Sequence, residues 1–544
     1  MKKSILLLLF IFSTVVSSLF QGCTKQLDEV NLREPVADGY YNLKQGYLDL
    51  INACYTNTRS QITGGGFCLM EYGTDLWTNA SDAEGNEFNS YLPELQASNA
   101  KIYSLWSTYY LGIAACNTAI SRSTNNITGM TQAEIDIKVA EAYFLRAWYY
   151  SILVMNFGGV PLVTEEVTTV QTTASRATEV EVYAQVIADL LKAETLLPKT
   201  QADVGRTTKP AAQAMLARVY LWIKNYPKAE AYAKTVISDG GYTFALQPTF
   251  AQLWNQDNQV NNEIIWAIQF SRNLRINDPP NALCLYFTPR YDLQPGMQRA
   301  LEYSRPYPRF MATRWYLDLM QANRWRDSRY DAVWLEAYKA NYAKTMPAGM
   351  NLGDTAYIVV PYVASAALRA SKPYKIIDIT AYYNGENTYG ALQIYPTTTK
   401  YHDKYRDAIN SGTGTRDVFE IRLAEMYLIA CEALYMQPGK AAEALPYINE
   451  VRKRAAKPGH IADMMATVND LSIDFILDER ALELGAERYR WIDLKRTGKL
   501  IERVKLYNPA GRSRILVKHL VRPIPSSFLD RLTNKADFIQ NPDY

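Results

Sequence analysis

The stretch that decides the fold is Phe475–Leu500, which reads FILDERALELGAERYRWIDLKRTGKL. Its apolar residues recur at helical spacing up to Gly485, a common helix stop, and a second short helical pattern follows. Either Ser472 or Asp474 can cap the first helix. The stretch is rich in charge for apolar helices, so its charged side chains either form a functional site or pair with one another inside the fold.

Two carboxylates in this stretch share one face of the first helix. Glu479 and Glu483 lie four residues apart, a spacing that brings side chains together on a helix surface. Such a pair could act as general acid and base. The alternative is a network of ion pairs that fixes how two helices meet. No His, Cys or Ser with a plausible base lies nearby, so we expect Glu479, Arg480, Glu483 and Arg490 to be ion-paired within the fold.

The N-terminal residues have the pattern of an export signal. Two lysines precede the apolar run Ile5–Phe12, which is too short and interrupted to span a bilayer, so residues 1–22 are predicted to be a signal peptide. Cys23 follows Gly22, as in a lipobox, although the two residues before the glycine depart from the usual ones. We expect lipidation of Cys23, with residues 23–39 as a tether; the alternative is ordinary cleavage that leaves an unmodified cysteine.

The composition is that of a globular body without a strong charge. The chain has 544 residues, of which 48% are hydrophobic, enough for a sizeable core. The formal net charge is +3, and Lys2 and Lys3 of the signal peptide contribute two of those charges. This balance gives no support to a nucleic-acid partner or a strongly polyanionic one. No stretch beyond the signal peptide reads as a transmembrane span.

Cysteines and histidines give no sign of a metal or cofactor. Five cysteines remain beyond Cys23, an odd number whose spacing matches no disulfide framework, and we expect most of them to be buried thiols. A bridge between Cys54 and Cys68 stays open for an exported protein. The three histidines are scattered, and no phosphate-binding glycine motif occurs, so we expect no metal and no cofactor. The five cysteines are Cys54, Cys68, Cys116, Cys284 and Cys431.

A divergent internal repeat is the main architectural signal. In three helical stretches a small residue is followed three positions later by tyrosine, the spacing at which tetratricopeptide-like helices pack. A second helix follows each after a breaker, and Thr178 with Glu181 forms a capping box for one of them. An earlier pair is expected at Gly46–Tyr55 and Lys101–Ile120. The repeated pairs are Ala147/Tyr150, Ala217/Tyr220 and Ala424/Tyr427.

The predicted fold is therefore mostly α, a tetratricopeptide-like scaffold of helical pairs with large loop-rich, partly β insertions. We assign the scaffold to residues 40–241, a loop-rich insertion to 242–416 and a final helical pair with the charged stretch to 417–544. A further loop, 61–100, leaves the first helix pair as the expected ligand loop. Loops of this length are usually functional or disordered, and their aromatic content argues against disorder. The strand-like runs of the large insertion are Glu263–Phe270, Ala356–Val363, Tyr374–Tyr382 and Ala391–Tyr395.

The aromatic content indicates a binding function. Tyr and Trp number 40 and 10; their rings stack on the apolar faces of sugars, and the same mixture suits peptides. Trp77 lies on the ligand loop and is either a binding platform or a loop anchor. Trp315 has helical flanks and is better explained by packing. The candidate ligand-binding residues are Asp75, Trp77, Asn79 and Asp82 on the first loop and Tyr286, Arg290 and Tyr291 on the second insertion.

Several segments resemble the SusD/RagB family of outer-membrane nutrient-binding lipoproteins. ERALELGAERYRWIDLKRTGKL looks like the C-terminal signature of that family, Ser304–Met320 like its middle motif, and the tail from Val521 to Tyr544 like its usual ending. Arg488 and Asp543 each stand where the family usually has a glycine. Both departures concern turns, so they bear on local geometry.

The resemblance implies a lipoprotein anchored at the outer membrane, facing the cell exterior and partnered with a SusC/RagA-like TonB-dependent transporter. It implies no catalysis and an oligosaccharide ligand, with peptides bound by a minority of members. A glycan site predicts Trp77 together with Tyr286 or Tyr291 on one exposed surface. Two other hypotheses remain. A glycosidase needs two carboxylates flanking a cleft, as Asp75 and Asp82 might if a sugar lay between them, and a scaffold that binds only protein would pack its aromatic loops inward.

Overall fold

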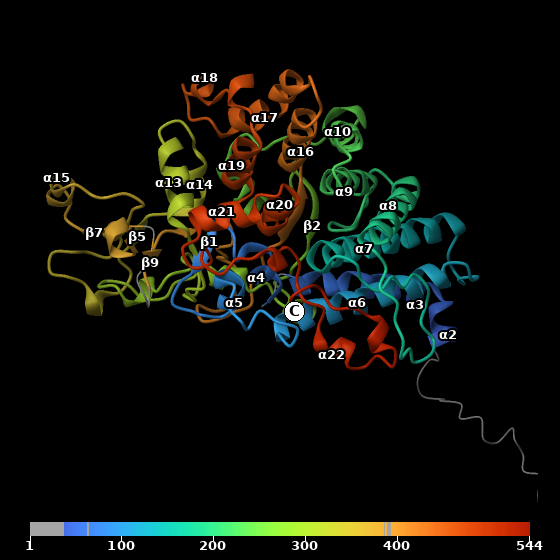
Figure 1. The fold of residues 1–544 in the computed structure, drawn as a ribbon. Coiled ribbons are helices and arrows are strands. Elements are labelled where there is room, and N and C mark those ends of the chain that lie inside the picture. Colours follow the sequence, from blue (N-terminus) through green and yellow to red (C-terminus); the bar gives the residue numbers. More distant parts are fainter. Residues whose placement is uncertain (1–36, 62–64, 386, 389–392) are drawn as a thin grey trace, which may run out of the picture.

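The computed structural model describes residues 37–61, 65–385, 387–388 and 393–544. The predicted signal peptide, Cys23 and nearly all of the predicted tether therefore lie outside the described residues. Figure 1 shows helices stacked along the right-hand side, helices α16 to α19 at the top and the loop-rich insertion on the left, while the C-terminus lies near the bottom.

A continuous stack of helices forms the scaffold, and each helix packs against the next one in the series. The stack crosses the large insertion without a break, because α10 packs directly against α16. The predicted helical-pair scaffold is confirmed. Its members are α3 (Lys44–Thr56), α6 (Ala100–Arg122), α7 (Gln132–Phe157), α8 (Glu179–Leu196), α9 (Lys209–Trp222), α10 (Tyr226–Lys234), α16 (Leu423–Tyr435) and α17 (Ala441–Ala455).

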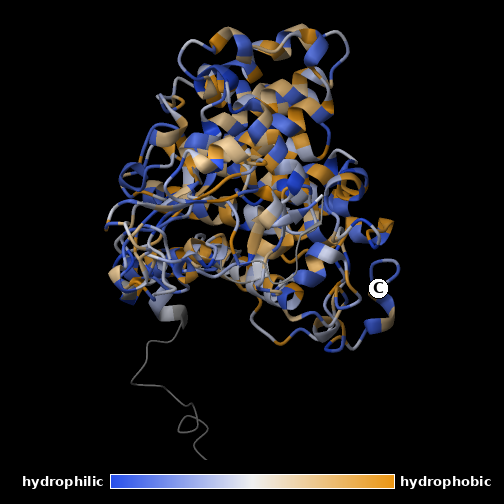
Figure 2. Cartoon of the chain, turned by 90° about the vertical axis from the view of Figure 1, so that its left-hand side faces the viewer, coloured by the Kyte–Doolittle hydropathy of each residue, from blue (hydrophilic) through white to orange (hydrophobic). Residues whose placement is uncertain are grey.

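Small residues let these helices approach closely. A side chain at Gly112 of α6 would overlap the Tyr149 ring of α7, since a Cβ there would lie 2.5 Å from it. Ala147 and Tyr150 are fully buried, and the Tyr150 hydroxyl donates a 2.8 Å hydrogen bond to the carbonyl of Val163. The repeat pattern thus reports packing positions. Figure 2 shows hydrophobic and hydrophilic residues alternating along the helices, as expected when one face packs inward.

Short sheets organise the insertion. Strand β2 (Ile264–Ile268) pairs antiparallel with β11 (Val418–Arg422), which brings the two ends of the insertion together where the chain enters α16. A three-stranded sheet contains β5 (Ala337–Lys339), β6 (Thr355–Val359) and β7 (Lys375–Ile377). Three of the four predicted strand regions are confirmed. The fourth is not: Ala391 and Leu392 lie outside the described residues, and residues 393–395 form no strand.

A strand pair joins the predicted ligand loop, 61–100, to the large insertion. Strand β1 (Trp77–Asn79) runs antiparallel to β3 (Phe310–Ala312), with Trp77 opposite Ala312. Scaffold, insertion and C-terminal region contribute to one hydrophobic core. Cys54 and Cys68 both lie in this core and are not bridged to each other, so the alternative of a Cys54–Cys68 bridge is wrong. The other three cysteines are buried as well.

Candidate functional site

The charged stretch folds as predicted from its local signals. Helix α19 (Ile473–Leu484) is capped by Ser472, whose Oγ accepts a 3.0 Å hydrogen bond from the amide of Phe475, and it ends at Gly485. The short helix α20 (Arg490–Arg496) follows. Of the two capping candidates, Ser472 is therefore the one used.

The two carboxylates of α19 are buried inside a network of arginines. Glu483 accepts from Arg329 at 3.1 Å and from Arg422 at 2.7 Å, and it also pairs with Arg454. Glu479 accepts from Arg329 at 2.7 Å and from Arg452. Burial alone would raise the pKa of Glu483, but the charges of Arg454, Arg422 and Arg329 outweigh it and hold that pKa far below its usual range. Such a carboxylate is a poor general base.

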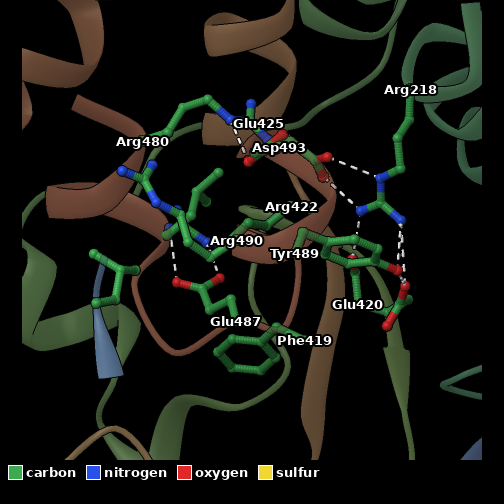
Figure 3. A pocket seen from close by; sticks show the side chains of 12 residues that line it. Arg218, Phe419, Glu420, Arg422, Glu425, Arg480, Glu487, Tyr489, Arg490 and Asp493 are labelled. Atoms are coloured by element: carbon green, nitrogen blue, oxygen red, sulfur yellow. Dashed lines mark hydrogen bonds and ion pairs between the residues drawn. The ribbon is translucent and has the colours of Figure 1, made fainter. Parts of the chain in front are cut away.

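The predicted ion pairing is confirmed for all four residues, because Arg480 pairs with Asp493 and Arg490 with Asp75, both at 2.7 Å. The stretch lines one part of a cavity of about 20 Å³, shown in Figure 3. That volume holds about one water molecule and no sugar ring. In Figure 3 the lining side chains point at one another, with Arg218 on Glu425 and Arg422 on Glu487. The stretch is a structural element and not a ligand site.

The two departures from the family glycines fall on left-handed backbone. Arg488 has φ = 77° and Asp543 has φ = 66°, a region that glycine enters without steric cost. Arg488 is fully buried, its side chain pairs with Glu420, and its amide donates to Glu71. These interactions account for a non-glycine residue at that turn.

Asp75 is not available to a substrate. It is fully buried, and its Oδ2 accepts from Arg490 at 2.7 Å and from Arg503 at 3.0 Å. Burial opposes ionisation of Asp75, but the two guanidinium groups outweigh it and lower the pKa of that carboxyl. The hypothesis of an Asp75–Asp82 glycosidase pair is therefore wrong, since one of its two carboxylates cannot flank a cleft.

The aromatic candidates are packed inside the core. Trp77 is 1% exposed; its ring stacks on Trp334 with centroids 6.1 Å apart and meets the Phe287 ring edge-on. Tyr291 is fully buried against Tyr338, and Tyr286 is 6% exposed. The predicted exposed surface of Trp77 with Tyr286 or Tyr291 is thus wrong. The reason is the pairing of β1 with β3, which turns the Trp77 ring inward.

The remaining polar candidates lie half-buried at the rim of the loop. Asp82 accepts a 2.8 Å bond from Arg309, and the Arg309 guanidinium lies 4.1 Å from the Tyr286 ring centre and 5.1 Å from that of Tyr307. Asn79 donates to the Tyr72 hydroxyl, while its Oδ1 has no hydrogen-bond partner in the described chain. We define this group as the rim cluster: Asn79, Asp82, Arg309, Tyr286 and Tyr307.

Arg290 does not join the rim cluster through its side chain, which pairs with Asp292 at 2.9 Å. The sequence reasoning missed Arg309 and Tyr307. The signal was present, because Tyr307-Pro-Arg309-Phe places an arginine among aromatic residues inside the middle motif. Trp315, which the sequence assigns to packing, does pack against the hydrophobic core, and its partly exposed ring also lines a surface depression.

The described residues contain neither a grouped set of metal ligands nor a membrane-crossing helix. In that part of the chain no three His, Cys, Asp or Glu side chains are grouped so that they could hold a metal ion. No helix there is both long enough and apolar enough to cross a bilayer.

A helical stack with loop-rich small sheets at its side is the SusD-like fold, and solved structures share it. A laminarin-binding SusD-like protein superimposes with a TM-score of 0.69 at 22% identity, over 92% of this chain and all of that chain. A SusD homolog from Bacteroides thetaiotaomicron gives a TM-score of 0.71 at 21% identity, over 93% of this chain and 98% of that one.

The chain belongs to the SusD family, whose model matches residues 262–544. A second family model, described as starch-binding and associating with the outer membrane, matches residues 48–221. The SusD-like protein P2 of Formosa agariphila is 25% identical over 433 residues, 78% of this chain and 76% of that protein. The starch-binding protein SusD of Bacteroides thetaiotaomicron is 25% identical over 445 residues, 76% and 74% of the two chains. The family consists of glycan-binding proteins associated with the outer membrane, and not of enzymes.

Proposed function

We propose that this protein is a cell-surface lipoprotein that captures an oligosaccharide and delivers it, uncut, to a SusC-like TonB-dependent transporter. The observation that carries the proposal is the match to the starch-binding and SusD family models, which together cover both halves of the chain. In this proposal Cys23 carries the lipid anchor and the ligand-binding face is turned to the cell exterior.

The rim cluster supports a ligand site on the loop face. Asp82 and the Tyr307 ring are half-buried there, and the buried guanidinium of Arg309 holds the Asp82 carboxylate in place beside that ring. Sugar hydroxyls need both donors and acceptors, and aromatic rings cover the apolar face of the sugar. The Asp82 carboxylate is already paired with arginine, which suits binding better than acid–base chemistry.

A second candidate function is a scaffold that binds only protein. The inward packing of Trp77 and Tyr291 is what that hypothesis predicts. The half-buried side chains of Asn79, Asp82 and Tyr307 in the rim cluster favour the glycan proposal instead. The other alternative is a role in peptide uptake. Peptides that co-purify with the protein would distinguish this role from glycan binding and from a scaffold that binds only protein.

Calorimetric titration of residues 24–544 tests the proposal. The probes are neutral β-glucan and α-glucan oligosaccharides, with a mixed peptide library as the comparison. We expect saturable binding of at least one neutral glycan and a weaker affinity after Asp82→Ala. A binding heat with peptides but with no glycan would indicate that the protein takes part in peptide uptake. No binding heat with either class of ligand would favour the scaffold that binds only protein.

The anchor and the partner are tested in the native membrane. We expect the full chain to fractionate with the outer membrane and to co-purify with a TonB-dependent transporter, and a Cys23→Ser variant to leave the membrane fraction. Recovery of the wild-type chain in the soluble periplasm would contradict this part of the proposal.

A further inference from the structure

A surface depression of about 350 Å³ lies at the start of α13 (Arg314–Asn323) and the end of α21 (Leu500–Tyr507), two helices labelled in Figure 1. Gly385, which follows strand β8 (Tyr383–Asn384) in its hairpin with β9 (Asn387–Thr388), also lines it. None of the ligand-binding residues predicted from the sequence lines this depression. Its lining residues are Arg314, Trp315, Asp318, Gly385, Leu506 and Tyr507.

Two stacked aromatic rings form the apolar part of the lining. The ring centroids of Trp315 and Tyr507 are 4.6 Å apart, and the ring planes differ by 23°. The guanidinium of Arg503 lies 5.2 Å from the centre of the Trp315 ring, and Asp75 in turn holds Arg503 at 3.0 Å. Trp315 and Tyr507 are half-buried, so the contacts fix both rings while part of each still meets solvent. A ligand that stacks there pays little for ordering the platform.

The backbone under Trp315 is fixed as well. Thr313 caps α13, because its Oγ1 accepts a 3.2 Å hydrogen bond from the amide of Tyr316 and donates to the carbonyl of Asp75. Trp315 therefore sits in the first turn of a capped helix, a more rigid support than an open loop.

An ion pair between Arg314 and Asp318 forms the polar part of the depression's lining. Arg314 Nε lies 2.9 Å from both carboxylate oxygens of Asp318, and the two side chains are 32% and 51% exposed. Side by side, they present donors and acceptors to the depression, the combination that neighbouring sugar hydroxyls require. Their charges cancel, and the charge of Arg503 beneath the rings is taken up by carboxylates such as Asp75 and Asp478. The lining thus favours a neutral ligand over an anionic one.

A larger hollow of about 610 Å³ elsewhere on the surface offers no such platform. The guanidinium of Arg206 lies over the Tyr55 ring, 5.1 Å from its centre. The second arginine that lines this hollow, Arg59, already donates hydrogen bonds to the backbone carbonyls of Gln269, Ile276 and Asp278.

We propose that the Trp315–Tyr507 depression is a carbohydrate subsite for one neutral hexose unit of an oligosaccharide. The apolar face of the sugar ring packs against the solvent-exposed part of the stacked Trp315–Tyr507 pair, and the hydroxyls at its edge bind Arg314 and Asp318. This inference rests on the proposed function and adds to it a second contact region, apart from the rim cluster, and a preference for uncharged sugars.

Calorimetry with neutral laminari- and malto-oligosaccharides tests the subsite in four proteins. Trp315→Ala should weaken binding about tenfold, or about 1.4 kcal/mol. Asp318→Asn should weaken it several-fold, and because that side chain is half exposed this variant stays folded if Trp315→Ala does not. Trp325→Ala is the matched control: Trp325 follows the same helix, is 55% exposed, and packs on His460 away from the depression, so its loss should leave affinity unchanged.

The outcomes separate this inference from the proposed function. Wild-type binding that is unchanged in Trp315→Ala and Asp318→Asn overturns the subsite and leaves the proposed function standing. Wild-type protein that binds no glycan overturns both. Equal losses in Trp315→Ala and Trp325→Ala contradict a specific platform. Tighter, Trp315-dependent binding of sulfated or uronic-acid oligosaccharides contradicts the assignment to neutral sugars.

Discussion

Replacing Glu483 by alanine should destabilise the fold and leave glycan affinity unchanged. Glu483 is fully buried and neutralises part of the positive charge of three arginines, Arg329, Arg422 and Arg454. The side chains of these arginines are 0%, 2% and 4% exposed, respectively. Removing one member of a buried ion-pair network costs about 3–5 kcal/mol, because the partner charges are left uncompensated.

The remaining carboxylates place the expected loss at the lower end of that range. Arg329 keeps Asp327 and Glu479, and Arg422 keeps Glu263 and Glu487. Arg454 keeps only Glu263 among the described ion pairs. We therefore expect a loss of about 3 kcal/mol, and a smaller one for Glu483→Gln, which preserves the shape and one acceptor oxygen.

Urea unfolding followed by tryptophan fluorescence measures the effect as a shift of the midpoint. The matched control is Glu450→Ala, because Glu450 forms a surface pair with Lys453 in which both side chains are about half exposed; such pairs contribute about 0–1 kcal/mol. Equal midpoints for Glu483→Ala and Glu450→Ala would refute the reasoning. A Glu483→Ala protein with a native midpoint and no glycan affinity would move this network into the ligand site.

Three further predictions concern pH and turns. Glu479, Glu483 and Asp75 all have pKa values lowered in the fold, so their stabilisation is present above pH about 4 and is lost as the pH falls below it; a melting temperature that stays constant from pH 5 to pH 3 would contradict this. Burial raises the pKa of Glu71 to about 8, so the folded state holds a proton that the unfolded state releases above pH about 4.3, and this stabilisation is lost as the pH rises towards 8. Glu71→Gln mimics the protonated carboxyl, so the melting temperature of this variant minus that of the wild type should increase from pH 5 to pH 8. A difference that stays constant over this range would disprove the raised pKa of Glu71. Asp543 has φ = 66° and is exposed, so Asp543→Gly should raise the melting temperature slightly and Asp543→Val should lower it, whereas equal shifts would rule out backbone strain.

Local signals allowed the helical scaffold to be predicted from the sequence. The Thr178–Glu181 capping box starts α8 as expected, since both groups lie within one turn. The ion pairing of Glu483 also follows from local signals, because Glu483 shares a helix face with Glu479 in a stretch rich in arginine. Its partners were not predictable, since Arg329 lies 154 residues away in the chain.

The candidate site was predicted less well, because burial of a loop side chain depends on distant partners. Trp77 turns inward because β1 pairs with β3 of the second insertion. Asn79, two residues on, remains half-buried at the rim. The surroundings of Trp315 were also not predictable, because its flanking residues are those of an ordinary helix. Its stacking partner, Tyr507, comes from α21, which is distant in the sequence.

The most direct test of the central claim is a binding experiment that also examines the recovered ligand. Purified residues 24–544 are titrated with a neutral oligosaccharide of defined length, and the bound sugar is released and sized. The account predicts saturable binding and a sugar recovered at its original length. A shortened sugar, or saturable binding to protein or peptide with none to any glycan, would contradict it.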